Sequence, residues 1–193
     1  MMYEHKNGLT LRKIEKEDLK LLKELKDESW FGTHNIAIIN MADQEIWFNK
    51  ITQNVNHNII MIAEQGDQPI GLYKISDIDW LNRHYNSAHD VFKKHRGLGL
   101  GYKVVEAGVD FGFEVLNMHR IDTEVLANNV ASHKTVLFAG YVLEGTRREA
   151  VHKCGKWIDS NFYGVLYEDW IQLDRVKAYG GCCNRSYQPK DGK

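Results

Sequence analysis

Apolar residues recur with two different spacings in the first half of the chain, and each spacing predicts a different element. The stretch 9–14 alternates apolar and polar residues as a half-buried strand does. The stretch 15–28 places its leucines on one face of a helix among charged residues. The elements predicted in this half are strands over 9–14, 59–64 and 69–75 and helices over 15–28 and 43–54.

The second half of the chain alternates between strands and helices. A strand over 87–93 leads through a glycine-rich loop into a helix over 102–116, and a strand over 119–127 follows. Because strand, helix and strand come in this order, the two strands need a crossover connection and pair in parallel. The remaining predicted elements are a helix over 131–138 and strands over 142–150 and 157–167. The pattern therefore predicts an α/β fold.

Length and charge limit the classes of protein that remain. We expect one domain over 1–175, followed by a loosely ordered tail over 176–193. The 25 basic and 26 acidic residues give a net charge of −1, which predicts no basic surface for nucleic acid. No apolar run reaches the roughly 18 residues of a membrane span, and the first six residues lack the apolar core of a signal peptide. We expect a cytoplasmic protein that binds neither nucleic acid nor membrane.

The cysteines and histidines do not follow a metal-binding or disulfide pattern. Cys154 stands alone and Cys182 is adjacent to Cys183, so the three cysteines form neither a disulfide framework nor a spaced ligand set. The nine histidines are scattered along the chain. We expect no metal.

The run from Lys94 to Gly101 carries alternating glycines between a predicted strand and a predicted helix. Glycines let the backbone turn sharply and approach a ligand, and a helix N-terminus offers unpaired N–H groups to an anion. The run lacks the Gly-Lys-Ser/Thr of a Walker loop, and its third glycine comes one residue early for a dinucleotide fingerprint. Two interpretations remain: a loop that binds a pyrophosphate, or a glycine-rich turn before a helix.

Arg96 to Gly101 has the form Arg-x-x-Gly-x-Gly, which resembles the coenzyme A loop of the GNAT acetyltransferase superfamily. Downstream, Arg120 to Asn129, Ser132 and Gly140 to Arg148 resemble the family pattern R-I-x-x-x-V-x-x-x-N-x-x-S followed by G-F/Y-x-x-E-G-x-x-R. The branch that it resembles most is that of the ribosomal-protein alanine N-acetyltransferases, which also includes polyamine and nucleotide-aminosugar acetyltransferases. The resemblance implies a central twisted mixed sheet of about seven strands, flanked by helices, with acetyl-CoA in a splay between strands four and five.

The resemblance also implies a set of cofactor contacts. Backbone N–H groups of Arg96 to Gly101 would hold the pyrophosphate, and the strand edge over 91–93 would pair with the pantetheine arm like an added strand. Asn129 would hydrogen-bond the cofactor, or its side chain would cap the helix over 131–138 instead. The predicted cofactor-binding residues are Val91, Phe92, Lys93, Arg96, Gly97, Leu98, Gly99, Leu100, Gly101, Tyr102, Asn129 and Ser132.

Direct acetyl transfer from a thioester to an amine needs a base for the amine and a hydrogen-bond donor for the departing thiolate. Glu124 matches a position where some family members carry a glutamate base; the alternative is a solvated strand carboxylate. Many members have a tyrosine acid where this chain has Val136. Ser132 matches the serine of the alanine N-acetyltransferase branch and is the candidate donor to sulfur; the alternative is a serine that bonds its own helix backbone.

The segments 29–55 and 77–86 are poorly patterned and are expected to select the acceptor. The predicted acceptor contacts are Trp30, His34, Trp47, Trp80 and Tyr85. The leading function is acetyl-CoA-dependent acetylation of a primary amine on a small molecule such as an aminosugar nucleotide or a polyamine. The alternatives are acetylation of the N-terminal α-amine of a ribosomal protein, and a non-catalytic domain that senses acyl-CoA. A homodimer is a further expectation from the family.

Overall fold

The computed structural model describes residues 2–34, 38–54 and 56–174. Its strands are β1 (Met2–Glu4), β2 (Thr10–Lys13), β3 (Asn58–Gln65), β4 (Gln68–Asp79), β5 (His84–Val91), β6 (Arg120–Leu126), β7 (Val142–Lys153) and β8 (Lys156–Leu166). Its helices are α1 (Leu19–Ser29), α2 (Met41–Gln53), α3 (Leu100–Glu114), α4 (Val130–Phe138) and α5 (Tyr167–Trp170), with 3-10 turns η1 (Lys16–Asp18) and η2 (Lys93–His95). The tail predicted over 176–193 lies outside the described residues.

The strands form one mixed sheet in the order β1-β2-β3-β4-β5-β6-β8-β7. β5 and β6 pair in parallel, whereas the other neighbouring strands are antiparallel. The predicted crossover is therefore confirmed, and α3 is the connecting helix. The sheet has eight strands instead of about seven, because Met2–Glu4 pairs with β2 as a short edge strand. Three residues are too few to show an alternating pattern in the sequence.

The predicted and observed ends of the strand and helix next to the glycine loop differ by two or three residues. The strand predicted over 87–93 starts earlier and ends at Val91, where η2 turns the chain away. α3 begins at Leu100, two residues before its predicted start. Gly99 has a φ of 75°, a left-handed conformation that glycine adopts without strain, and it turns the chain directly into the helix.

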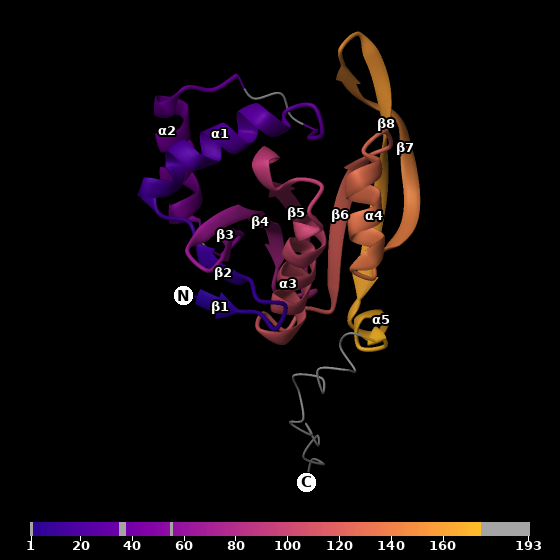
Figure 1. The fold of residues 1–193 in the computed structure, drawn as a ribbon. Helices are drawn as coiled ribbons and strands as arrows, with labels where there is room; N and C mark the ends of the chain where they lie inside the picture. Colours follow the sequence, from indigo (N-terminus) through magenta and orange to yellow (C-terminus); the bar gives the residue numbers. More distant parts are fainter. Residues whose placement is uncertain (1, 35–37, 55, 175–193) are drawn as a thin grey trace.

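Helices cover both faces of the sheet, and α3 lies beside α4 on one of them (Figure 1). Alternation along β3 separates the two faces. Met61 and Ala63 belong to the core cluster under α3, whereas Ile60 and Ile62 belong to the smaller cluster with Leu19 of α1. The long helix α3 therefore closes the larger core, and α1 with α2 closes the smaller one.

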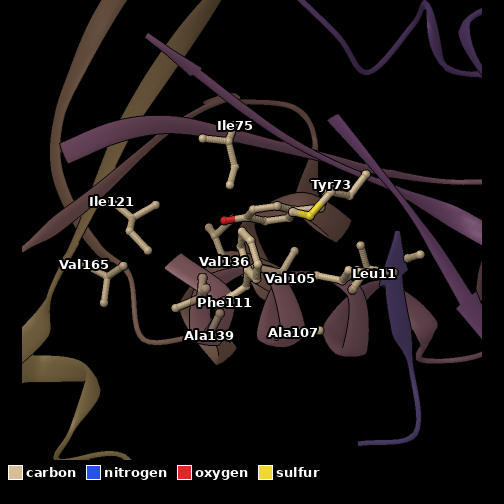
Figure 2. Close-up of a cluster of buried hydrophobic side chains, with 14 of the residues drawn as sticks. Leu11, Tyr73, Ile75, Val105, Ala107, Phe111, Ile121, Val136, Ala139 and Val165 are labelled. Carbon is tan, nitrogen blue, oxygen red and sulfur yellow. The ribbon is translucent and has the colours of Figure 1, made fainter. Parts of the chain in front are cut away.

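The larger core is packed closely around the tyrosines of β4 and β5. Figure 2 shows Tyr73 between the sheet and α3, near Val105. Two glycines in α3 make room for these rings: a Cβ on Gly108 would lie 2.3 Å from the Tyr73 ring, and a Cβ on Gly112 would lie 2.2 Å from the Tyr85 hydroxyl. The helix can approach the sheet this closely only because both positions lack a side chain.

β5 and β6 are paired over only part of their length. His84–Ser87 pairs with Arg120–Thr123. Beyond these four pairs β5 continues with β4 alone, and β6 continues with β8 as far as Leu126. At the last of these pairs the Ser87 hydroxyl links the two strands. It donates to the Asp122 carbonyl at 3.0 Å and lies 2.8 Å from the Tyr141 hydroxyl. The predicted splay is therefore confirmed, between the strands now numbered β5 and β6.

No helix among the described residues is long and apolar enough to cross a membrane.

Candidate active site

The loop between η2 and α3 leaves successive backbone N–H groups open. Among the described residues, no backbone carbonyl accepts a hydrogen bond from Gly97, Leu98 or Gly99. A Cβ on Gly97 or Gly99 would meet nothing within 4 Å, so the space in front of these N–H groups is clear. The first turn of α3 contains no acidic residue. Open N–H groups at a helix N-terminus without a nearby carboxylate fit the pyrophosphate of coenzyme A.

Arg96 differs from the expectation for this loop. Its backbone N–H donates to the Lys93 carbonyl at 3.2 Å and is therefore not free for a ligand. Its guanidinium donates from Nε to the Val91 carbonyl at 2.8 Å and from Nη2 to the Ser29 hydroxyl at 3.0 Å. Arg96 thus ties the loop to β5 and α1, and the open N–H groups begin at Gly97.

The strand edge predicted over 91–93 is already hydrogen-bonded. The N–H of Val91 donates to Asp90 Oδ1 at 2.8 Å, that of Phe92 to the Ile70 carbonyl at 3.0 Å, and that of Lys93 to Glu28 Oε2 at 2.7 Å. These three N–H groups are therefore not a free edge for the pantetheine arm. Phe92 directs its N–H toward β4, and main-chain groups alternate in direction along a strand. The main-chain groups of His89 therefore point toward the gap where β5 and β6 separate. His89 was not among the residues predicted from the sequence, because a main-chain contact does not depend on the identity of the side chain.

The other predicted cofactor residues divide by exposure. Leu100 is buried, as are Val91 and Phe92, whereas Leu98 is exposed. Tyr102 lines a cavity of about 570 Å³ between α3 and α4, together with Lys134, Leu137 and Phe138.

Asn129 and Ser132 begin α4 on the β6 side of the gap. Asn129 Oδ1 accepts from the Ser132 N–H at 3.1 Å, and Asn129 Nδ2 donates to the Gly32 carbonyl at 3.3 Å. Asn129 is thus the N-cap of α4, the alternative considered from the sequence, and its contact with the cofactor stays a prediction. The Ser132 hydroxyl has no partner among the described residues, so it does not bond its own helix backbone. Val136 is buried in the core.

Glu124 projects from β6 close to the point where the strands separate. Ile121 and Val125 belong to the core under α3, so the side chain of Glu124 lies on the opposite face of the sheet. Its Oε1 is buried and has no hydrogen-bond partner among the described residues. His34 Nε2 lies 3.5 Å and Arg147 Nη1 lies 3.7 Å from this oxygen. Glu124 is therefore a carboxylate with one oxygen ready for a further donor.

His34 reaches Glu124 from the loop after α1. Its Nε2 lies 2.7 Å from the hydroxyl of Ser160, which is fully buried in β8. Burial lowers the pKa of His34; Glu124 acts to raise that pKa, and the positive charges of Lys153 and Arg147 lower it further. The imidazole is therefore neutral at pH 7. Ser160 had no signal in the sequence, because it is 126 residues from His34.

The structure separates the predicted acceptor contacts into two groups. Trp30 and His34 lie on the loop that approaches Glu124. Tyr85 does not reach an acceptor, because alternation along β5 buries it under α3 with its hydroxyl 3.3 Å from that of Tyr73. Trp80 lies in the β4–β5 connection, at the paired end of β5, and Trp47 packs beside the smaller core cluster with Lys26 Nζ 4.6 Å above its ring. The prediction for Tyr85 is therefore corrected, whereas contact of Trp80 or Trp47 with an acceptor stays a prediction.

A cavity of about 700 Å³ lies between the loop after α1 and the tip of the β7–β8 hairpin. We call it the hairpin cavity. Its aromatic walls are Trp30, Phe31 and Trp157, and its charged walls are Lys153, Lys156 and Asp159. This cavity was not predictable from the sequence, because its walls come from three separate parts of the chain.

Comparisons with known proteins agree with this geometry. The model of the acetyltransferase (GNAT) domain family matches residues 8–142. An uncharacterized N-acetyltransferase, p20 of Bacillus licheniformis, is 27% identical over 168 residues, which cover 84% of this chain and 94% of that protein. A spermidine N(1)-acetyltransferase of Vibrio cholerae is 24% identical over 168 residues, covering 84% of this chain and 95% of that protein.

The fold has a solved counterpart as well. The crystal structure of spermidine N-acetyltransferase from Vibrio cholerae, in complex with CoA and spermine, superposes with a TM-score of 0.81 at 22% identity. The superposition covers 86% of this chain and 99% of that one. With the family model spanning more than half of the sequence, the chain belongs to the GNAT acetyltransferase family and is an N-acetyltransferase that uses acetyl-CoA.

Proposed function

We propose that the chain acetylates a primary amine of a small molecule and that Glu124 removes the proton from that amine. The buried Glu124 Oε1 carries this proposal, because it has no hydrogen-bond partner among the described residues. A buried acceptor without a donor costs about 1–3 kcal/mol, so such an atom is expected to meet its partner in a ligand. An amine N–H is a suitable donor.

The remaining groups around the gap suit the other needs of the reaction. Acetyl-CoA supplies an acyl group activated as a thioester. The main-chain N–H of His89 faces the gap and can donate a hydrogen bond to an oxygen that gains negative charge. The Ser132 hydroxyl has no partner among the described residues, and it can donate to a departing sulfur in place of the tyrosine replaced by Val136.

Two classes of small acceptor are carried forward, polyamines and aminosugar nucleotides. The name of the Vibrio cholerae relative, a spermidine N(1)-acetyltransferase, supports a small molecule over a ribosomal-protein N-terminus. The open Glu124 carboxylate supports a catalytic domain over one that only senses acyl-CoA. A cytoplasmic location and a homodimer stay predictions from the sequence.

The test is the release of free thiol from acetyl-CoA in the presence of polyamines, aminosugar nucleotides, free amino acids and alanine-initiated peptides. We expect turnover of at least one small amine. Glu124→Gln should lower kcat about 10²-fold, the scale on which a general base contributes, and should leave acetyl-CoA affinity unchanged by calorimetry. Turnover of the peptides alone would overturn the small-molecule proposal, and an unaltered kcat would remove Glu124 from the reaction.

A further inference from the structure

The hairpin cavity contains two lysines, Lys153 and Lys156, that have no role in the removal of a proton by Glu124. Lys153 is only 4% exposed, and its Nζ donates to the Trp30 carbonyl. Among the described residues, neither Lys153 nor Lys156 forms an ion pair. The wall also holds one carboxylate, Asp159, which accepts from the Glu149 N–H at 2.7 Å and forms no ion pair with either lysine, so the two lysines give the wall a net positive charge. A buried ammonium is costly without a counter-charge, so an anion is the ligand that this wall would stabilise.

Exposed aromatic rings surround these ammonium groups. Trp30 is 38% exposed, Phe31 is 54% exposed and Trp157 is 62% exposed. A single exposed ring is common on a protein surface, but here three of them line one cavity together with two lysines. Aromatic rings offer stacking surfaces to a planar ligand such as a nucleobase. The wall therefore combines contacts for an anion with contacts for a planar ring.

The hairpin cavity lies within reach of Glu124. Ala127 belongs to its wall and follows Glu124 by three residues, which corresponds to about 10 Å of extended chain. Lys153 Nζ also donates to the carbonyl of Trp30, four residues before His34, and His34 Nε2 lies 3.5 Å from Glu124 Oε1. Glu124 itself is not part of the cavity wall, so a molecule bound there needs an extension of about this length, such as a sugar and its linkage, to bring an amine to the carboxylate.

We propose that the acceptor carries its primary amine on a sugar joined to a nucleoside diphosphate, whose phosphates bind Lys153 and Lys156 and whose base lies among Trp30, Phe31 and Trp157. This inference rests on the proposed function and names its acceptor class. A polyamine lacks both an anionic and a planar group. Its ammonium groups would also meet the positive charges of Lys153, Lys156 and Arg147.

Binding of UDP tests this subsite without relying on turnover. Calorimetry on the full chain saturated with coenzyme A should detect UDP binding, and Lys156→Glu should weaken it roughly tenfold, the scale of a lost charge-assisted hydrogen bond. Lys156 is exposed, so this variant should fold. Lys20→Glu, which makes the same charge change on the exposed face of α1, is the matched control and should bind UDP as the parent does. Absence of UDP binding, or equal binding by Lys156→Glu and the parent, would overturn the subsite.

Kinetics then separate the cofactor from the acceptor and one acceptor class from the other. UDP should inhibit competitively against the acceptor and not against acetyl-CoA; competition with acetyl-CoA alone would assign the hairpin cavity to the cofactor instead. An aminosugar nucleotide should have a kcat/KM at least about tenfold above that of the matching free aminosugar and above that of spermidine. A preference for spermidine would overturn this inference and leave the proposed function intact, whereas turnover of peptides alone would overturn both.

Discussion

The two ends of the β5–β6 pair differ in whether their polar atoms have hydrogen-bond partners within the protein. At the paired end, Ser87 and Thr123 are buried and hydrogen-bonded to neighbouring groups. At the separated end, the N–H groups of Gly97 to Gly99 and the Oε1 of Glu124 have no such partner among the described residues. Buried polar groups in folded proteins are almost always paired, so the buried Glu124 Oε1 marks this end as a ligand site, and the exposed N–H groups of the loop are open to an anion at the same end. The same two strands thus form a closed core at one end and a ligand site at the other.

Side chains keep the separated end from closing as a β-ladder. The Val91 N–H is taken by Asp90 Oδ1 and the Val91 carbonyl is taken by Arg96 Nε. These two bonds satisfy main-chain groups that a ladder with β6 would otherwise use. Arg96 also anchors the loop to Ser29 at the end of α1. Specific contacts therefore keep the gap between β5 and β6 open. On the β5 side these are hydrogen bonds from polar side chains, and on the β6 side they are the packing of α4 and β8.

Gly99→Asp should break the separated end with the largest effect. The φ of 75° costs a non-glycine residue about 1–2 kcal/mol, and the new carboxylate would lie where the open N–H groups fit a pyrophosphate. We expect the Kd for acetyl-CoA, measured by calorimetry, to rise about 10²-fold. Gly66→Asp is the matched control, because Gly66 also has a positive φ with nothing within 4 Å, in the β3–β4 turn. A Kd within threefold of the parent would contradict the role of the loop.

Gly108→Ala should instead disturb the closed core between α3 and the sheet and leave the ligand site in place. The added Cβ would lie 2.3 Å from the Tyr73 ring, so helix and sheet must move apart. Overpacking of this kind lowers the free energy of unfolding by about 1–3 kcal/mol, which urea denaturation measures. The acetyl-CoA Kd of the folded protein should stay unchanged. Gly145→Ala, where nothing lies within 4 Å of the new Cβ, is the control; equal stability of the two variants would contradict close packing at Gly108.

The fold was largely predictable from the sequence, whereas the acceptor side was not. Alternation and helical periodicity are local signals, and they located the paired strands and α3 to within a few residues. The glycine loop was also recognisable, because its chemistry depends on glycines that are consecutive in the chain. The edge over 91–93 was misjudged because hydrogen bonds from Asp90 and Glu28 side chains leave no periodic pattern.

Contacts between distant segments explain the remaining differences. Ser160 and Lys153 reach the site from β8 and β7, more than 120 residues after the loop that they contact. Tyr85 follows the alternation of β5, but the sequence alone does not say which face of that strand α3 covers. The sequence therefore located a feature that one segment forms, such as the glycine loop, and missed contacts where the fold brings two segments together.

His34→Gln should have the smallest effect of the three variants, a change in the pH dependence of kcat/KM that arises at the separated end. Burial lowers the pKa of His34 below its usual value of 6.5, so the imidazole gains its proton only as the pH falls into the range below that value. The imidazolium then lies 3.5 Å from Glu124 Oε1 and competes with the amine for the carboxylate. In the parent, kcat/KM for the acceptor should therefore fall through the His34 pKa as the pH decreases. Glutamine keeps a donor for Ser160 but does not ionise, so the activity of His34→Gln, normalised to its value at pH 7.5, should fall less than that of the parent as the pH decreases below 6.5.

The control for this variant is His57→Gln, which alters an exposed histidine before β3 and should keep the parent profile. A purely structural role for His34 would lower activity by the same factor at every pH, so coincident normalised profiles of His34→Gln and the parent would exclude the competition between imidazolium and amine. Retention of the shift in a background of Glu124→Gln would also contradict it, because the effect must pass through the carboxylate. The Glu124 oxygen, which has no hydrogen-bond partner among the described residues, therefore meets the amine without a competing imidazolium only while His34 is neutral, and that dependence has no counterpart among the paired hydroxyls at the other end of the strands.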